Sequence, residues 1–254
     1  MTQTIAPILI ADDDQVNLDL VDAFLSQSGF ETVTVLNGQE AVTQASEQPF
    51  LAILLDISMP ILDGKQAATL IRGMSPHNRD TPIAALTAYQ LDVNDPTLSA
   101  ARIDAVFRKP VEWPALIDWL TSLTNQGAAP TDRPSHVADD AQAIDINEQM
   151  ITQLRSSLPP ETVQRLFSRF QEDLAQRLTE LEQASAQQNP EEISKITHAI
   201  CGIASAFGAT SLEKQARAIH NDPKCVFAMN ESEVLDRLNT QATLSEQKLQ
   251  ALIK

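Results

Sequence analysis

Residues 8–14 read Ile-Leu-Ile-Ala-Asp-Asp-Asp, an apolar run that ends abruptly in three carboxylates. A second run, residues 51–56, reads Leu-Ala-Ile-Leu-Leu-Asp and ends in Asp56. Nearly continuous apolar runs of this length are typical of strands that are covered on both faces. The two runs therefore predict core strands of a parallel sheet, each with an acidic side chain at its carboxyl end.

Working outward from these runs, the first 125 residues alternate short apolar segments with amphipathic stretches. The expected strands are 7–11, 31–36, 51–56, 82–87 and 105–108, and the expected helices are 15–27, 38–48, 64–74, 96–101 and 112–123. This alternation implies a parallel sheet with right-handed crossovers. Five strands in about 120 residues fit the flavodoxin-like α/β order 2-1-3-4-5, so we assign 1–125 to one (βα)5 domain.

The rest of the chain has a different character. Residues 126–143 are rich in Pro, Ala and polar side chains and are interpreted as a linker. Residues 144–254 show four helix signals: an apolar stripe over 163–181, an Asn-Pro start at 189–190 with a stop at Gly208, a capping box at 210–213 and a final start at Asn230. We expect an all-α domain of the four-helix-bundle type.

The composition limits the classes of function. The formal net charge of −16 disfavours binding to nucleic acid or to an anionic membrane surface. No apolar run is long enough to span a bilayer, and the two cysteines do not suggest a disulfide framework. We therefore expect a cytoplasmic protein with free thiols.

The strand order brings charged side chains together at one edge of the sheet. Because the first and third strands are neighbours, Asp12, Asp13 and Asp56 are expected to converge. Their mutual repulsion is relieved by a hard divalent cation, and Mg²⁺ suits oxygen ligands. Thr87 ends the fourth strand and Lys109 follows the fifth, which adds a hydroxyl and an ammonium group. Together these groups suit an incoming phosphoryl group, with a carboxylate as the nucleophile.

Four segments carry a recognisable pattern: Ile8–Asp14, Leu54–Gly64 (LLDISMPILDG), Ala85–Ala88 and Arg108–Pro110. Together they resemble a response-regulator receiver domain. The resemblance implies Asp56 as the phosphorylated aspartate, Asp12, Asp13, Asp56 and the Ser58 carbonyl as Mg²⁺ ligands, Thr87 and Lys109 as phosphoryl contacts, and a cis Lys109–Pro110 peptide. The sequence departs from the family at Val106, where an aromatic residue is common, and at Arg102, where glycine is common.

The second candidate acceptor is His198. An apolar stripe on its helix consists of Ile193, Ile196, Ile200, Ile203 and Phe207. His198 lies on nearly the opposite side of the helical wheel, and we expect it to be exposed among small or polar residues, namely Ser194, Lys195, Cys201, Gly202 and Ser205. A neutral imidazole is nucleophilic near physiological pH. The other histidines, His77, His136 and His220, are interpreted as solvated.

The string Thr197–Ala209 resembles a histidine phosphotransfer domain. The resemblance implies a helical bundle with His198 as the phosphoryl carrier, beside which Gly202 leaves room for a partner's active site. Cys201 stands where lysine is usual in the family. Lys195, one turn earlier, is a candidate replacement for that cation.

These features predict a two-component phosphorelay protein, a magnesium-dependent phosphoprotein that accepts phosphoryl groups on Asp56 and relays them through His198. Its partners would be a histidine kinase and other receiver or phosphotransfer proteins. No nucleotide-binding glycine loop is present, so the chain is expected to be a phosphoryl carrier rather than an enzyme. In the alternative, the receiver is a switch for a helical interaction or dimerisation domain without phosphotransfer. A DNA-binding output is disfavoured because the acidic C-terminal half has no basic recognition helix.

Overall fold

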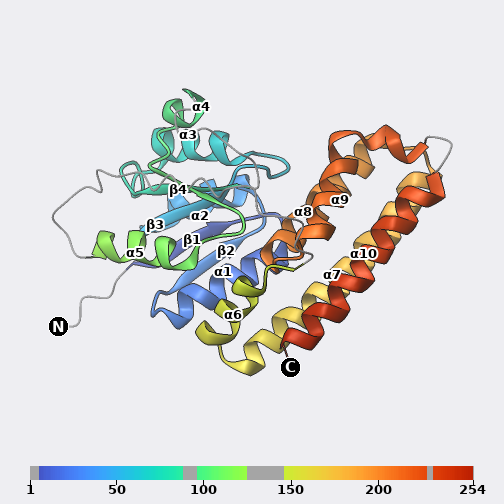
Figure 1. Cartoon of the computed structure of the whole chain (residues 1–254). Helices are drawn as coiled ribbons and strands as arrows, with labels where there is room; N and C mark the ends of the chain where they lie inside the picture. Colours follow the sequence, from blue (N-terminus) through green and yellow to red (C-terminus); the bar gives the residue numbers. More distant parts are fainter. Residues whose placement is uncertain (1–5, 88–95, 125–145, 228–230, 254) are drawn as a thin grey trace. The chain divides into compact units, whose positions relative to one another are not determined.

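The computed structural model of the chain describes residues 6–87, 96–124, 146–227 and 231–253. It divides into two compact units, Met1–Ala138 and Asp139–Lys254 (Figure 1). The predicted linker 126–143 and His136 within it lie outside the described residues.

The first unit is built on a five-stranded parallel sheet in the order β2-β1-β3-β4-β5. The strands are β1 (Ile8–Ala11), β2 (Thr32–Val35), β3 (Ala52–Asp56), β4 (Ile83–Thr87) and β5 (Ala105–Arg108). Every residue of β1, β3 and β4 is buried, as expected for strands covered on both faces. The order places β1 beside β3, with Ala11 opposite Leu55.

Helices cover both faces of this sheet (Figure 1). They are α1 (Gln15–Gln27), α2 (Gly38–Glu47), α3 (Gly64–Met74), α4 (Pro96–Ala100) and α5 (Trp113–Thr124). On one face, side chains of α2, α3 and α4 join those of the strands in one apolar cluster. On the other, Phe24 of α1 stacks on Trp113 of α5 with ring centroids 3.9 Å apart. The flavodoxin-like prediction is confirmed, and each predicted element ends within one residue of the observed one.

The second unit is helical throughout its described residues. Its elements are α6 (Glu148–Ser157), α7 (Pro160–Ala186), α8 (Pro190–Ala206), α9 (Thr210–Asn221), the 3₁₀ turn η1 (Pro223–Phe227) and α10 (Glu231–Ile253). The long helices α7 and α10 run side by side, and α8 packs against α9 (Figure 1). Phe170 of α7 meets Phe207 at the end of α8, with ring centroids 4.7 Å apart, in the core of the bundle.

Helix ends in this unit agree with the sequence in part. Asn189 caps α8 by accepting the Glu192 N–H, and Gly208 follows its end with a positive φ of 66°. The predicted capping box at Thr210 is wrong, because Thr210 is already the first helical residue and the cap position, Ala209, has no side-chain acceptor. The sequence analysis also missed α6, although Asn147 caps it and Met150, Ile151 and Leu154 form its buried face. The predicted start at Asn230 lies outside the described residues.

The turn before β5 has a backbone conformation that favours glycine, the residue that is common at position 102 in the family that the sequence resembles. Arg102 adopts a left-handed backbone with φ of 53°, a region that L-residues enter at a cost. Its carbonyl accepts hydrogen bonds from the Arg72 guanidinium, the Nη2 distance being 3.1 Å. Arg72 is also paired with Asp104 at 2.7 Å, so the turn is held in place from α3.

We expect Arg102→Gly to raise the free energy of unfolding of the first unit by about 0.5–1 kcal/mol, because glycine adopts this conformation without strain. Urea unfolding followed by tryptophan fluorescence measures this, since the chain's two tryptophans, Trp113 and Trp119, both lie in α5. Arg102→Ala is the matched control: it removes the exposed pair with Asp80 but keeps the left-handed backbone, and should gain nothing. Equal stability of the glycine and alanine variants would contradict the strain argument.

Candidate functional site

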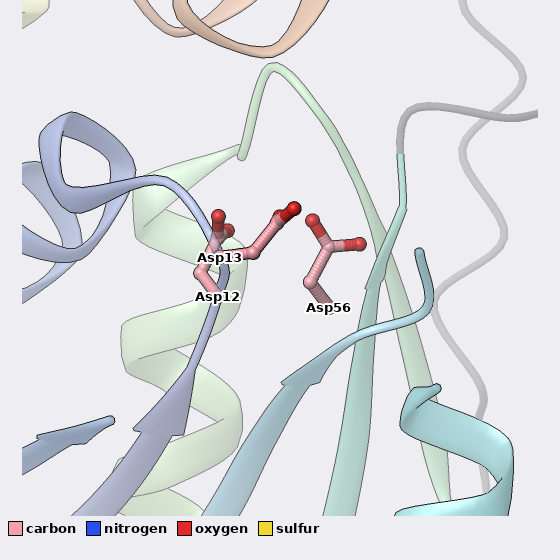
Figure 2. A group of neighbouring side chains, drawn as sticks. All are labelled: Asp12, Asp13 and Asp56. Atoms are coloured by element: carbon pink, nitrogen blue, oxygen red, sulfur yellow. The ribbon is translucent and has the colours of Figure 1, made fainter. Parts of the chain in front are cut away.

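Three carboxylates meet at the carboxyl edge of the sheet. Asp12 and Asp13 follow β1, and Asp56 is the last residue of the adjacent strand β3. One oxygen from each lies within 4.8 Å of the others (Figure 2). Asp12 and Asp56 are buried, whereas Asp13 lies at the exposed rim. The predicted convergence of the three side chains is therefore present in the structure.

Lys109 bridges two of these carboxylates. It follows β5, and its Nζ lies 2.6 Å from Asp12 Oδ2 and 2.7 Å from Asp56 Oδ2. The side chain is only 8% exposed, so both ion pairs are shielded from water. The Lys109–Pro110 peptide is cis, as the resemblance implied.

Backbone N–H groups connect Thr87 and Ser58, the two remaining predicted residues, to Lys109 and Asp56. Thr87, the buried last residue of β4, accepts the Lys109 N–H at its carbonyl oxygen, 2.7 Å away. The Ser58 N–H donates to Asp56 Oδ1 over 3.0 Å. Both residues thus belong to the same edge as Asp56 and Lys109, whereas their roles toward a ligand stay predictions.

Neighbouring residues hold the acidic loop in shape. Asp14 caps α1 by accepting hydrogen bonds from the N–H groups of Val16 and Asn17. The Asn17 side chain donates to Asp12 Oδ1 over 3.3 Å, a contact that sequence reasoning missed. At position 64 a Cβ atom would lie 2.2 Å from the Asp56 carbonyl oxygen, so only glycine lets α3 begin this close to the end of β3.

The electrostatics follow from burial and crowding. Burial raises the pKa of Asp12, an effect that Lys109 partly offsets and Asp56 reinforces. Burial together with the charges of Asp12 and Asp56 raises the pKa of Asp13 to about 6. Burial opposes the charged form of Lys109, but the two carboxylates outweigh it and raise the Lys109 pKa above its ordinary value. One ammonium group thus faces three carboxylates, and the pocket favours further positive charge.

His198 lies on α8, in the second unit. The five residues of the predicted apolar stripe are all buried, which confirms that side of the helical wheel. His198 was predicted to be exposed, but its side chain is half-buried. Its ring lies against that of His220 on α9, with centroids 5.1 Å apart.

The expected small, polar face around His198 is also corrected in part. Cys201 and Ser205 are buried, because α9 packs on this side of α8. The Cys201 Sγ approaches the Glu213 carbonyl oxygen at 3.7 Å, and burial raises the pKa of the thiol to about 12. Lys195 is exposed and pairs with Glu192, and Gly202 is half-buried.

His220 was wrongly interpreted as a solvated side chain. It is half-buried, and its Nδ1 lies 2.9 Å from the Ser194 carbonyl oxygen. The sequence did contain a signal for this position: Leu212, Ala216 and His220 follow each other at intervals of four residues, which places them on one face of a helix. Leu212 and Ala216 are buried, so the same face carries His220 toward α8.

Comparisons with known families agree with this arrangement. Residues 8–121 match the family model of the response regulator receiver domain, and residues 165–252 match that of the Hpt domain. The chain therefore consists of a response regulator receiver domain followed by an Hpt domain. This pair of domains makes it a two-component phosphorelay signalling protein, built from domains that carry phosphoryl groups.

Similar proteins match the receiver part. The signal transduction histidine-protein kinase BarA of Shigella flexneri is 35% identical over 105 residues, 41% of this chain and 11% of that protein. The transcriptional regulatory protein PrrA of Mycobacterium tuberculosis is 41% identical over 81 residues, 32% of this chain and 34% of that protein. The chain thus spans only a minor part of each.

Among solved structures, the receiver domain of sensor histidine kinase PA1611 from Pseudomonas aeruginosa PAO1 is 31% identical, with a TM-score of 0.45. The match covers 48% of this chain and all of that one, which holds a magnesium ion in its active site cleft.

No helix within the described parts of the present chain combines the length and apolar character that crossing a membrane requires.

The raised pKa of Asp13 gives a stability prediction. A folded pKa of about 6, against an ordinary 3.8, means that the charged form is disfavoured in the folded state. The resulting penalty is fully present above pH 6 and disappears as the pH falls toward 4. With a chelator present, Asp13→Asn should therefore raise the free energy of unfolding at pH 7.5. The expected gain is about 1 kcal/mol, because solvent screens the charges around this exposed side chain and reduces the penalty.

Tryptophan-monitored urea unfolding at pH 7.5 and pH 4.5 measures this effect, which should shrink at the lower pH. Asp118→Asn, which removes an exposed carboxylate from α5, is the matched control and should change little at either pH. Adding Mg²⁺ should stabilise the wild-type chain more than the Asp13→Asn variant. A gain in stability at pH 4.5 as large as that at pH 7.5 would contradict the raised pKa.

Proposed function

We propose that Asp56 is the phosphoryl acceptor of the receiver domain. The observation that carries this proposal is the Asp56 carboxylate held 2.7 Å from a buried ammonium group, at the meeting point of three strand ends. In the reaction, a carboxylate oxygen of Asp56 attacks the phosphorus of a partner's phosphohistidine. The P–N bond breaks, its electron pair returns to the partner's imidazole, and an acyl phosphate forms on Asp56.

A magnesium ion fits the acidic group of this domain. Three carboxylates crowd within 4.8 Å, and burial, reinforced by the neighbouring carboxylates, raises the pKa values of Asp12 and Asp13. Carboxylate and carbonyl oxygens are the ligands that Mg²⁺ prefers. Asp12, Asp13, Asp56 and the Ser58 carbonyl would hold the ion, and it would neutralise charge on the phosphoryl oxygens.

Lys109 and Thr87 complete the site as phosphoryl contacts. The Lys109 ammonium already lies between two carboxylates and can exchange one of these pairings for an incoming phosphoryl oxygen. Thr87, buried at the end of β4, provides a hydroxyl from the neighbouring strand. Such preorganised donors stabilise the transferring group without a large rearrangement.

The Hpt domain carries the second acceptor in this proposal, His198. It is a half-buried histidine on α8, within the region 165–252 that matches the Hpt family, and a neutral imidazole nitrogen can take a phosphoryl group from an acyl phosphate. The chain then acts as a phosphoryl carrier without an ATP site of its own and depends on a separate histidine kinase. Its cytoplasmic location stays a prediction from the sequence.

Residue-specific labelling tests both acceptors. Incubation with a phosphorylated histidine kinase and Mg²⁺ should label the chain, and Asp56→Asn should abolish the alkali-labile acyl phosphate. His198→Gln should abolish the alkali-stable, acid-labile phosphate, whereas the exposed His77→Gln control should retain it. Chelation of Mg²⁺ should reduce labelling of Asp56 at least tenfold, in line with the charge that the ion neutralises.

One observation favours the alternative, in which the helical domain only binds a partner: Cys201, at the position where lysine is usual, is buried and contributes no cation. Label confined to Asp56, with His198 unlabelled in the wild-type chain, would support that alternative. Label on residues other than these two would contradict the whole proposal.

A further inference from the structure

The ring of His220 forms part of the surface around His198. Its centroid lies 5.1 Å from that of His198, and the two ring planes are inclined by 46°. His220 comes from α9, 22 positions along the chain, and is placed there because α9 packs along α8. A second imidazole beside the proposed phosphoryl carrier is therefore a consequence of the bundle's tertiary packing.

Ser194 fixes the orientation of this second ring. The His220 Nδ1 lies 2.9 Å from the Ser194 carbonyl oxygen and 3.1 Å from its hydroxyl. A carbonyl oxygen only accepts hydrogen bonds, so Nδ1 carries the hydrogen and Nε2 is the atom that gains a proton when the ring becomes charged. Because Ser194 precedes His198 by one helical turn, the same face of α8 holds both His198 and the anchor of His220.

Two side chains on the same helix, Cys201 and Lys195, provide no buried positive charge beside His198. Cys201 is uncharged and buried, and its pKa is raised to about 12. The Lys195 side chain is 73% exposed and is paired with Glu192. The His220 ring, held in place by Ser194, is thus an ionisable neighbour of a phosphoryl group on His198.

We propose that His220 is a second residue of the phosphotransfer site, whose protonated imidazolium stabilises the phosphoryl group on His198. The inference rests on the proposed role of His198. In the transfer, a neutral His198 nitrogen attacks the phosphorus of an acyl phosphate, the P–O bond breaks, and its electron pair leaves with the carboxylate. The phosphoryl group keeps its negative charge, which favours the charged form of the neighbouring His220, and the two charges attract each other.

The elements packed around His220 carry further charged or titratable groups. Several are paired within their own helix, namely Lys195 with Glu192 on α8, Arg217 with Glu213 on α9, and Arg237 with Glu233 on α10, while Asp222, Lys224 and Cys225 lie just beyond the end of α9. A comparison of variants at position 220 leaves all of these groups unchanged. Differences between these variants therefore arise from the side chain at position 220.

The test uses the full chain carrying Asp56→Asn, with potassium phosphoramidate as the phosphoryl donor. The steady-state label on His198 is measured from pH 6 to pH 8.5 with His, Gln or Lys at position 220. Because an imidazole carries more positive charge at lower pH, the ratio of label in the His220 chain to that in His220→Gln should be roughly three to ten at pH 6 and fall toward one at pH 8.5. His220→Lys should exceed His220→Gln at both pH values, and His77→Gln should follow the unchanged chain.

The possible outcomes distinguish a failure of the His220 role from a failure of phosphotransfer through His198, on which that role rests. Label on His198 with a pH-independent ratio would leave the phosphotransfer role intact and overturn the role of His220. No label on His198 in any chain would overturn the proposed function and this inference with it. Should His220→Gln disturb the fold, NMR titration of the unmutated ring decides: after phosphorylation of His198, His220 should stay charged to a higher pH, and an unchanged titration would overturn the proposal.

Discussion

The receiver domain depends on a buried ammonium group held between two carboxylates. Parallel topology forces the ends of β1 and β3 together, and with them Asp12 and Asp56. Burial of both without compensation would be strongly unfavourable, and loss of one partner from a buried ion pair typically costs about 3–5 kcal/mol. Lys109 satisfies both at once, and in doing so it links the segment after β5 to the ends of β3 and β1, which lie two and three positions inward in the sheet. The same cation leaves the pocket with a net negative charge, which accounts for its affinity for further positive charge.

Much of this domain was predictable because its signals are local. A fully buried parallel strand must be apolar, and a carboxylate where such a run stops marks the carboxyl end of the strand. The carboxyl ends of adjacent parallel strands meet, so Asp12 and Asp56 could be placed together from the sequence. The contact between Asn17 and Asp12 could not be predicted from the sequence, because it depends on how the first turn of α1 lies over the loop after β1. The left-handed turn at Arg102 is likewise set by Arg72, which lies 30 residues earlier in the sequence.

In the helical domain the sequence predicted less, because contacts between helices leave no local signal. A helical wheel identified the apolar stripe of α8 correctly, but it contains no information on what packs against the remaining faces. Small side chains such as Cys201 and Ser205 look compatible with solvent, yet α9 covers them. Ser205 Oγ is even left without a hydrogen-bond partner in this part of the described chain, which indicates that tight helix packing outweighed the polarity of its hydroxyl. The spacing of His220 from Leu212 and Ala216 shows that it lies on the buried face of α9, but only the packing of the bundle shows that this face meets α8.

The two proposed acceptors differ in the charges that surround them. At Asp56 the ammonium group of Lys109 is buried between two carboxylates, whose charges raise its pKa, so its positive charge persists throughout the neutral range. At His198 the adjacent ring is the imidazole of His220, which comes from another helix and is oriented by the Ser194 carbonyl oxygen. The receiver site therefore rests on a fixed cation that follows from strand order, whereas the surface around His198 rests on the packing of α9 against α8.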